Sequence, residues 1–251
     1  MITFMRALSV EHLKLKRTLT VWMVLVAPFV INLMVFLVTR EQAINYGVLE
    51  QTWLTYDQDV LMMWSVLMLP LLITLESALL GNSEHANQQW KHLFALPLPR
   101  WSYFAAKWSV LFELILAGSI FNLIFALLGG LGSHLLFPTM DLSAAAIPWN
   151  ELLLSNGKVF LSAILMLSIH TWISLRWKNI VVPIGSGMVA VVMALFVMRS
   201  DKYSPLFPWT LPIASFGMEN APMAQILLIS ILGGLLFAFF AAWDFSRRET
   251  L

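Results

Sequence analysis

Six long apolar segments decide what this chain can fold into. Each is almost free of charge and long enough to cross a bilayer, which takes about 20 helical residues at a rise of about 1.5 Å each. The segments are 19–38, 60–81, 103–137, 159–175, 180–198 and 223–243. The 251-residue chain is 59% hydrophobic and 12% charged, too little polar surface to cover a water-soluble globule. We therefore expect one transmembrane domain over residues 1–251.

The same segments favour helices over a β-barrel. Barrel strands alternate polar and apolar residues in segments of about ten, whereas these segments are apolar on every side. The sequence thus predicts an all-α integral membrane protein with six transmembrane helices. Within them, Pro70 predicts a kink. The pair Asn156-Gly157 predicts a break that leaves residues 151–155 as an outer turn.

The basic residues orient these helices. Six spans put both termini on one side, and placing that side in the cytoplasm leaves only Arg40, Lys158, Arg199 and Lys202 outside. The other eleven of the 15 Lys and Arg residues then lie inside. Because cytoplasmic loops are enriched in Lys and Arg, we expect both termini to be cytoplasmic.

Residues 1–18 form the first polar stretch. Met5, Leu8, His12 and Leu15 recur at helical spacing among basic residues, which predicts an amphipathic helix. Such a helix can lie on the inner membrane surface, held by anionic lipid or by a cytosolic partner. The alternative is an ordinary positive flank that orients the first span.

The second polar stretch, residues 82–97, predicts a short cytoplasmic helix. Asn82 or Ser83 can cap its start, and Pro97 must end it. Aromatic residues among polar ones favour a helix that docks into a groove on a soluble partner. A solvated loop helix is the alternative.

Ionisable groups at membrane depth are functional candidates because their burial is costly. Glu76, Glu113 and His170 are such groups. The two glutamates could instead pair with Lys107 or Arg100, and the histidine could be an ordinary packing residue. Asn122 belongs to a stripe of small and polar residues that either packs helix against helix or lines a path for substrate. The stripe comprises Ser119, Asn122, Ala126, Gly130 and Ser133.

Enzyme signatures are absent from the sequence. No G-x-x-x-x-G-K-[ST], H-E-x-x-H or G-x-S-x-G pattern occurs, so we assign no catalytic residue and no ATP site to this chain. His85 and His92 lack a third ligand, and we expect no metal site. These observations leave two kinds of function for the chain, a passage through the membrane or a scaffold.

Three motifs carry a family resemblance. The chain has E-H-L-K-L-K-R-T at 11–18, W-K-H-L-F-A-L-P-L-P-R at 90–100 and Y-F-A-A-K at 103–107. With six spans in this order, it resembles the ABC-2 type permeases of bacterial ABC exporters. The sequence P-W-x-x-P at 208–212 is similar to the short permeases of lantibiotic (bacteriocin) self-immunity transporters.

The resemblance implies a permease, not an enzyme, in the bacterial inner membrane. Two permease chains, identical or sister, would join two cytosolic ATPase subunits that bind ATP and Mg²⁺; no nucleic-acid partner is implied. The 82–97 helix would couple to the ATPase, and 199–222 would form an outer re-entrant cap. The residues expected to couple are Glu11, Lys14, Glu84, His85, Gln88, Trp90, Lys91, Phe94 and Arg100.

Amphipathic peptide antibiotics or other hydrophobic compounds are the expected cargo, with sodium and small drugs as alternatives. Two other function classes stay open. A membrane enzyme could use Glu76, Glu113 or His170, provided that two of them converge within hydrogen-bond reach. A non-transporting scaffold could bind a cytosolic protein.

Overall fold

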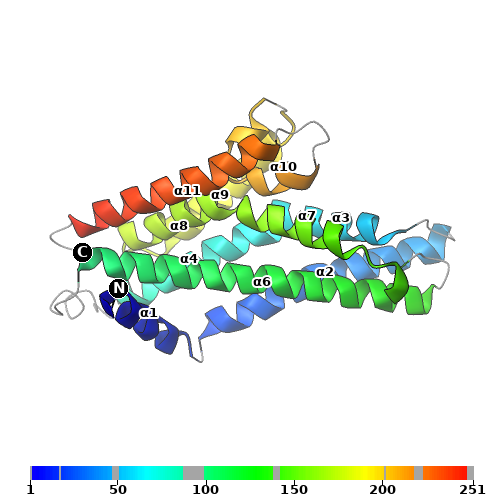
Figure 1. Ribbon diagram of the computed structural model, residues 1–251, viewed down its shortest axis with the longest axis horizontal. Helices are drawn as coiled ribbons and strands as arrows, with labels where there is room; N and C mark the ends of the chain where they lie inside the picture. Colours follow the sequence, from blue (N-terminus) through cyan, green and yellow to red (C-terminus); the bar gives the residue numbers. More distant parts are fainter. Residues whose placement is uncertain are drawn as a thin grey trace.

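The computed structural model describes residues 2–16, 18–46, 51–86, 99–137, 142–200, 202–217 and 223–247, and every regular element in them is a helix (Figure 1). The main helices are α1 (Ile2–Leu15), α2 (Leu19–Tyr46), α3 (Trp53–Met63), α4 (Leu69–Ala86), α6 (Arg100–Leu136), α7 (Trp149–Leu161), α8 (Ile164–Arg176), α9 (Val181–Val197), α10 (Leu211–Gly217) and α11 (Met223–Ser246). A π-helical turn, η1 (Trp64–Met68), joins α3 to α4, and the 3₁₀ turns η2 (Ala144–Ala146) and η3 (Ser204–Leu206) precede α7 and α10.

Five stretches of the described chain are long and apolar enough to cross a membrane. They are Leu19–Asn45, Trp53–Glu84, Arg100–Leu136, Trp149–Arg176 and Met223–Ser246. The sixth expected span corresponds to Val181–Val197, a shorter apolar helix of 17 residues. The all-helical membrane architecture is therefore confirmed, and a full sixth crossing stays a prediction.

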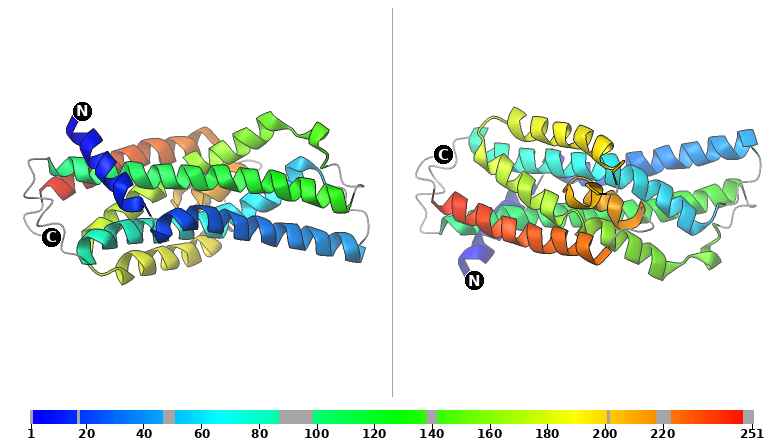
Figure 2. Two further views of the ribbon diagram at one scale, coloured as in Figure 1. Left: turned by 90° about the horizontal axis from the view of Figure 1, so that it is seen from below. Right: turned by 90° about the horizontal axis from the view of Figure 1, so that it is seen from above.

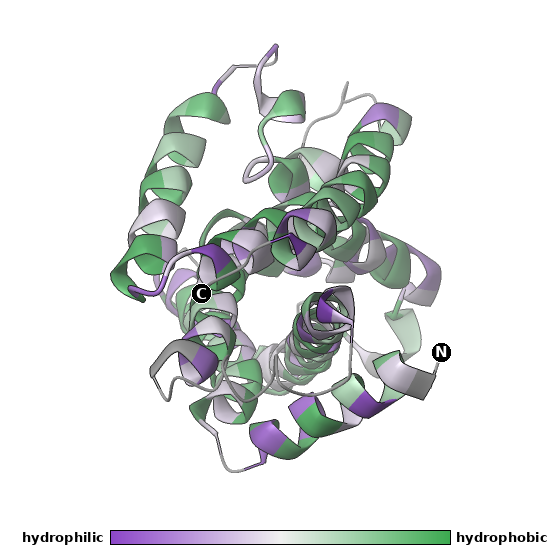
Figure 3. Cartoon of the chain, turned by 90° about the vertical axis from the view of Figure 1, so that its left-hand side faces the viewer, coloured by the Kyte–Doolittle hydropathy of each residue, from purple (hydrophilic) through white to green (hydrophobic). Residues whose placement is uncertain are grey.

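The helices run along one axis and share an end. α1 begins and α11 finishes at the left of Figure 1, where α4 also ends and α6 begins. α1 lies across the bundle there, against α6 (Figure 2). Seen from this end, α1 carries hydrophilic and hydrophobic residues side by side, whereas the helices behind it are mainly hydrophobic (Figure 3).

Helix α4 occupies the centre of the bundle. It packs against α2, α6, α8 and α9, and Leu72, Ile73 and Ala78 are almost completely buried. At Gly187 of α9 the packing needs glycine, because a Cβ atom would lie 2.3 Å from the Thr74 hydroxyl oxygen of α4. Movement of α4 must therefore displace neighbours on several sides.

Two predicted boundaries were wrong. The helix does not break at Asn156-Gly157, because the Asn156 side chain donates to Leu152 O one turn earlier and to Asp57 of α3. The break comes at Ser162-Ala163. Nor does a new helix start at Asn82 or Ser83, since α4 continues to Ala86.

The second span also starts earlier than expected. Thr52 and Thr55 form a capping box that begins α3 ahead of residue 60. Directly before Pro70, the N–H of Leu69 bonds to Trp64 O, five residues back. The helix is thus irregular where the kink was expected, since proline cannot donate and its ring crowds the preceding turn.

The segment before α11 returns into the bundle. Trp209, Thr210 and Leu211 are buried, and the Trp209 ring lies 5.3 Å from the ring of His170 on α8. Figure 2 shows α10 part-way along the molecule and not at its tip. This packing suits a re-entrant element, and its position on the outer side of a membrane stays a prediction.

Candidate functional site

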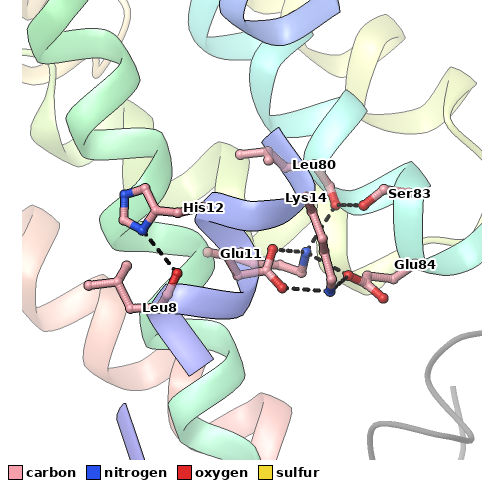
Figure 4. A network of polar contacts seen from close by, with 8 residues as sticks. Leu8, Glu11, His12, Lys14, Leu80, Ser83 and Glu84 are labelled. Carbon is pink, nitrogen blue, oxygen red and sulfur yellow. Dashed lines mark hydrogen bonds and ion pairs between the residues drawn. The ribbon is translucent and has the colours of Figure 1, made fainter. Parts of the chain in front are cut away.

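Four charged residues meet where α1 crosses the ends of α4 and α6. Glu11 and Lys14 come from α1 and Glu84 from α4 (Figure 4), and Lys107 comes from α6. We call these four residues the ion-pair cluster. Two carboxylates and two ammonium groups balance each other, so the set carries no net charge.

The cluster is tightly connected. Lys107 Nζ donates to Glu11 Oε2 at 2.7 Å and to Glu84 Oε1 at 3.1 Å. Lys14 Nζ donates to Glu11 Oε1 at 2.8 Å and also to Glu84. Lys107 Nζ further donates to the backbone oxygen of Leu80 at 3.2 Å. Each ammonium group thus bridges α1 and α4.

Three of the four charged side chains in the cluster are buried. The exposed fraction of the side chain is 0% for Glu84, 2% for Lys107 and 4% for Glu11, against 29% for Lys14. Three charges are therefore removed from water, and each needs its partners. Lys14 forms the solvent-facing side of the cluster.

The charges of the cluster stabilise each other. Burial raises the pKa of the Glu11 carboxyl, but the charges of Lys107 and Lys14, and the hydrogen bonds from both, outweigh it and lower that pKa below its usual value. Burial likewise lowers the pKa of Lys14, and Glu11 and Glu84 outweigh it, so that the net shift is upward.

The sequence of α1 explains how it presents these groups. Glu11 and Lys14 are three residues apart and so share one side of the helix. That side, with the buried Ala7, turns toward the bundle. Leu8 and Leu15 pack against the main core, as their spacing suggests, but Met5 is exposed. The buried side is rotated from the predicted apolar face, because ion pairing draws Glu11 inward.

A second contact ties α1 to α6 outside the cluster. His12 Nε2 lies 2.6 Å from Glu113 Oε2, and the two side chains are 44% and 48% exposed. The hydrogen bond with Glu113 raises the pKa of His12 above its usual value. An exposed pair of this kind stabilises by less than about 1 kcal/mol.

Of the predicted coupling residues, the structure brings Glu11, Lys14 and Glu84 together. Glu11 and Glu84 are buried within the chain, and only Lys14 of the three is partly exposed. Arg100 begins α6 and is partly exposed. The side chain of His85 and residues Gln88, Trp90, Lys91 and Phe94 lie outside the described part of the chain.

Sequence reasoning missed Lys107 as a member of this site. It was considered as the last residue of the Y-F-A-A-K motif and as a partner for Glu76 or Glu113, and that pairing was wrong, because Lys107 binds Glu11 and Glu84. A lone lysine at the start of an apolar segment requires a carboxylate partner, and this signal alone could have selected it.

The intramembrane candidates lie apart from one another. Glu113 pairs with His12, and His170 has Thr74 at 3.4 Å and Trp209 as its neighbours. Glu76 is fully buried on α4. No two of Glu76, Glu113 and His170 are in contact within the described residues, so the convergence that an enzyme would need is missing there.

Asn122 joins two helices. Its Oδ1 accepts from Asn32 Nδ2 of α2 at 2.9 Å. Farther along the same stripe, Gly130 lies directly against the Trp53 ring of α3. The stripe therefore packs α6 against α2 and α3.

Comparison with known proteins adds one match. A protein-family model described as "ABC-2 family transporter protein" matches residues 7–197, from within α1 to the end of α9. This range contains all four residues of the ion-pair cluster. No curated protein and no solved structure matches the chain.

Proposed function

Because the chain belongs to the ABC-2 family of transporter proteins, we propose that it is the permease subunit of an ATP-driven exporter. It is a multi-pass membrane protein, and permeases of this family generally work with ATPase subunits. In our proposal, two permease chains, identical or sister, join two ATPases that bind ATP and Mg²⁺. The assembly lies in the bacterial inner membrane with both termini of this chain in the cytoplasm.

The observation that carries the proposal is the position of the ion-pair cluster. Residues 87–98 connect α4 to α6, and the cluster joins the end of α4, at Glu84, to the start of α6, at Lys107. A force that an ATPase applies to 87–98 would therefore reach the transmembrane helices at the cluster. Helix α1 would move with them, because Glu11 and Lys14 complete the cluster.

The side chains at the centre of the bundle support a proposal for the type of cargo. Most of the side chains in the core around α4 are aliphatic or aromatic, such as Leu72, Trp64 and Phe160. Such surroundings suit amphipathic molecules better than a bare metal ion, which needs several oxygen ligands. We propose amphipathic peptide antibiotics of the lantibiotic type as the substrate class, together with other hydrophobic compounds.

Transport would follow from rigid-body movement of the two permeases. ATP-driven closure of the ATPases would rock the bundles and alternate access to the two sides, as packed helices tend to move as units. The packing of α4 against four helices supports such a movement, because α4 cannot shift alone.

Co-purification with a soluble protein bearing a Walker A loop tests the proposal. The Trp90→Ala, Phe94→Ala double variant should dissociate this ATPase or abolish its stimulation, while membrane insertion stays intact. Normal stimulation in the double variant would count against docking through 82–97. Full activity of the pure chain without any ATPase would refute the permease assignment.

Transport separates an exporter from a non-transporting scaffold, since both bind a cytosolic protein. Membrane vesicles that contain the permease and ATPase should accumulate a fluorescently labelled cationic amphipathic peptide when ATP is added. A complex that hydrolyses ATP but moves no such peptide would contradict the proposed substrate class.

A further inference from the structure

Glu76 of α4 is a buried carboxyl group without a counter-charge. Its exposed fraction is 0%, and neither carboxyl oxygen has a hydrogen-bond partner within the described part of the chain. The Thr20 side chain, in the first turn of α2, lies beside the carboxyl without meeting hydrogen-bond geometry. No residue of the ion-pair cluster is paired with this carboxyl group.

The charged and titratable groups on the helices around α4 have other partners or lie toward helix ends, as Arg100, His134 and Arg176 do. On α6, Lys107 is held by Glu11 and Glu84, and Glu113 faces His12. On α8, His170 lies against Thr74 and Trp209. Arg40 and Glu41 lie far along α2, and neither η1 nor α9 contains a charged residue. In the described chain, no cation is paired with Glu76.

An ionised carboxylate in such a place is strongly disfavoured. Burial without a counter-ion or hydrogen-bond donor costs far more for the anion than for the neutral acid. The neutral acid needs only one acceptor for its O–H group, and a hydroxyl oxygen such as that of the neighbouring Thr20 can supply one. A proton is also the one cation that needs no additional space.

Glu76 lies behind the ion-pair cluster along α4. Glu76, Leu80 and Glu84 are spaced by four residues and share one side of α4, so Glu76 lies about 12 Å behind Glu84 along the axis. Leu80 lies between them, and its backbone oxygen accepts from Lys107 of the cluster. Thr20 follows shortly after the turn that joins α1 to α2.

We infer that Glu76 is a proton-binding site, protonated while the ion-pair cluster is closed and releasing its proton to water when the cluster opens. Opening would separate α1 from α4 and α6 and would shift the start of α2, which removes the cover from the carboxyl. Water would then solvate the anion, and closure would again require a proton. The inference concerns this chain alone and does not depend on the ATPase or on the cargo.

Carbodiimide labelling tests the inference on the full chain in native membranes. N,N′-dicyclohexylcarbodiimide modifies protonated carboxyl groups in apolar surroundings, whereas a water-soluble carbodiimide modifies exposed ones. After digestion and mass spectrometry, we expect the apolar reagent to modify Glu76 at neutral pH. Glu113, the exposed carboxyl of α6, is the matched control and should react only with the water-soluble reagent.

Opening the cluster should reverse this selectivity. In Glu84→Gln or Lys107→Met, Glu76 should lose its reaction with the apolar reagent and gain reaction with the water-soluble one. Glu76→Gln should lose the adduct at this position, and if it fails to fold, the mapped wild-type adduct still decides the question. Unmodified Glu76 in wild-type membranes, with Glu113 labelled normally, would overturn the proton site. Unchanged selectivity in both cluster variants would overturn its link to the cluster.

Discussion

Replacement of Lys107 by methionine is the most direct test of the ion-pair cluster. Methionine fills a similar volume but lacks the charge, so Glu11 and Glu84 would lose the ammonium group at 2.7 Å and 3.1 Å. Breaking a buried ion pair by removing one partner costs about 3–5 kcal/mol. Because Lys14 still reaches both carboxylates, we expect the lower end of this range, about 3 kcal/mol.

The assay is unfolding of the purified chain in micelles, followed by the fluorescence of its 11 tryptophans. Glu113→Gln on the same helix is the control: it removes an exposed pair and should cost less than about 1 kcal/mol. Glu84→Gln combined with Lys107→Met leaves the Glu11–Lys14 pair balanced, so the double variant should be less destabilised than the sum of the two single variants, by about 1–3 kcal/mol.

Two results would refute this reasoning. If Lys107→Met unfolds as readily as Glu113→Gln does, burial does not make the cluster important for stability. If the two single effects add within about 0.5 kcal/mol, Glu84 and Lys107 do not interact energetically, despite their contact.

Two further predictions concern neighbouring contacts. Gly187→Ala should destabilise the chain by about 1–3 kcal/mol, because its Cβ would overlap the Thr74 side chain. Gly185→Ala on the same helix has nothing within 4 Å of the new Cβ and should be neutral in the same unfolding assay; equal effects would contradict the packing of α9. The raised pKa of His12, caused first by its hydrogen bond with Glu113, predicts a stabilisation below about 1 kcal/mol. It is complete below about pH 6.5 and is lost as the pH rises through the raised pKa. Unfolding curves between about pH 5 and 8 should show it in the wild type and not in His12→Gln; a slope that persists in this variant would assign it to another group.

The features that could be predicted from the sequence are those that depend on residues close together along the chain. Long apolar segments predict membrane helices, and they located the five long spans and the shorter apolar helix Val181–Val197. Pro70 marked the irregular turn before α4, since proline acts on its own neighbours. The Asn122 stripe likewise predicted helix packing, because small residues at one spacing let backbones approach.

What the sequence could not show is which side chains meet across helices. Glu11 and Lys107 are 96 residues apart, and no spacing rule links α1 to α6. The break expected at Asn156-Gly157 failed for the same reason, because Asp57 of another helix holds Asn156 in a helical turn. Local preferences were overruled by contacts that exist only in the folded bundle.

The contacts of α3 and α4 locate the place where the central helix can move. Asp57 accepts hydrogen bonds from Ser155 and Asn156, which fixes α3 to α7. Near its other end α4 is held by the ion-pair cluster, whose charges can be exchanged for water, and it also packs against α8, where Gly81 lies directly against Ser174. Between these two points lies the π-helical turn Trp64–Met68, where the regular hydrogen-bond ladder is already broken. A force applied beyond Ala86 would therefore bend the helix at this turn, together with the helices that pack against α4, while α3 stays in place. Since Glu76 lies on the moving side, the same displacement that opens the cluster would bring its carboxyl to water.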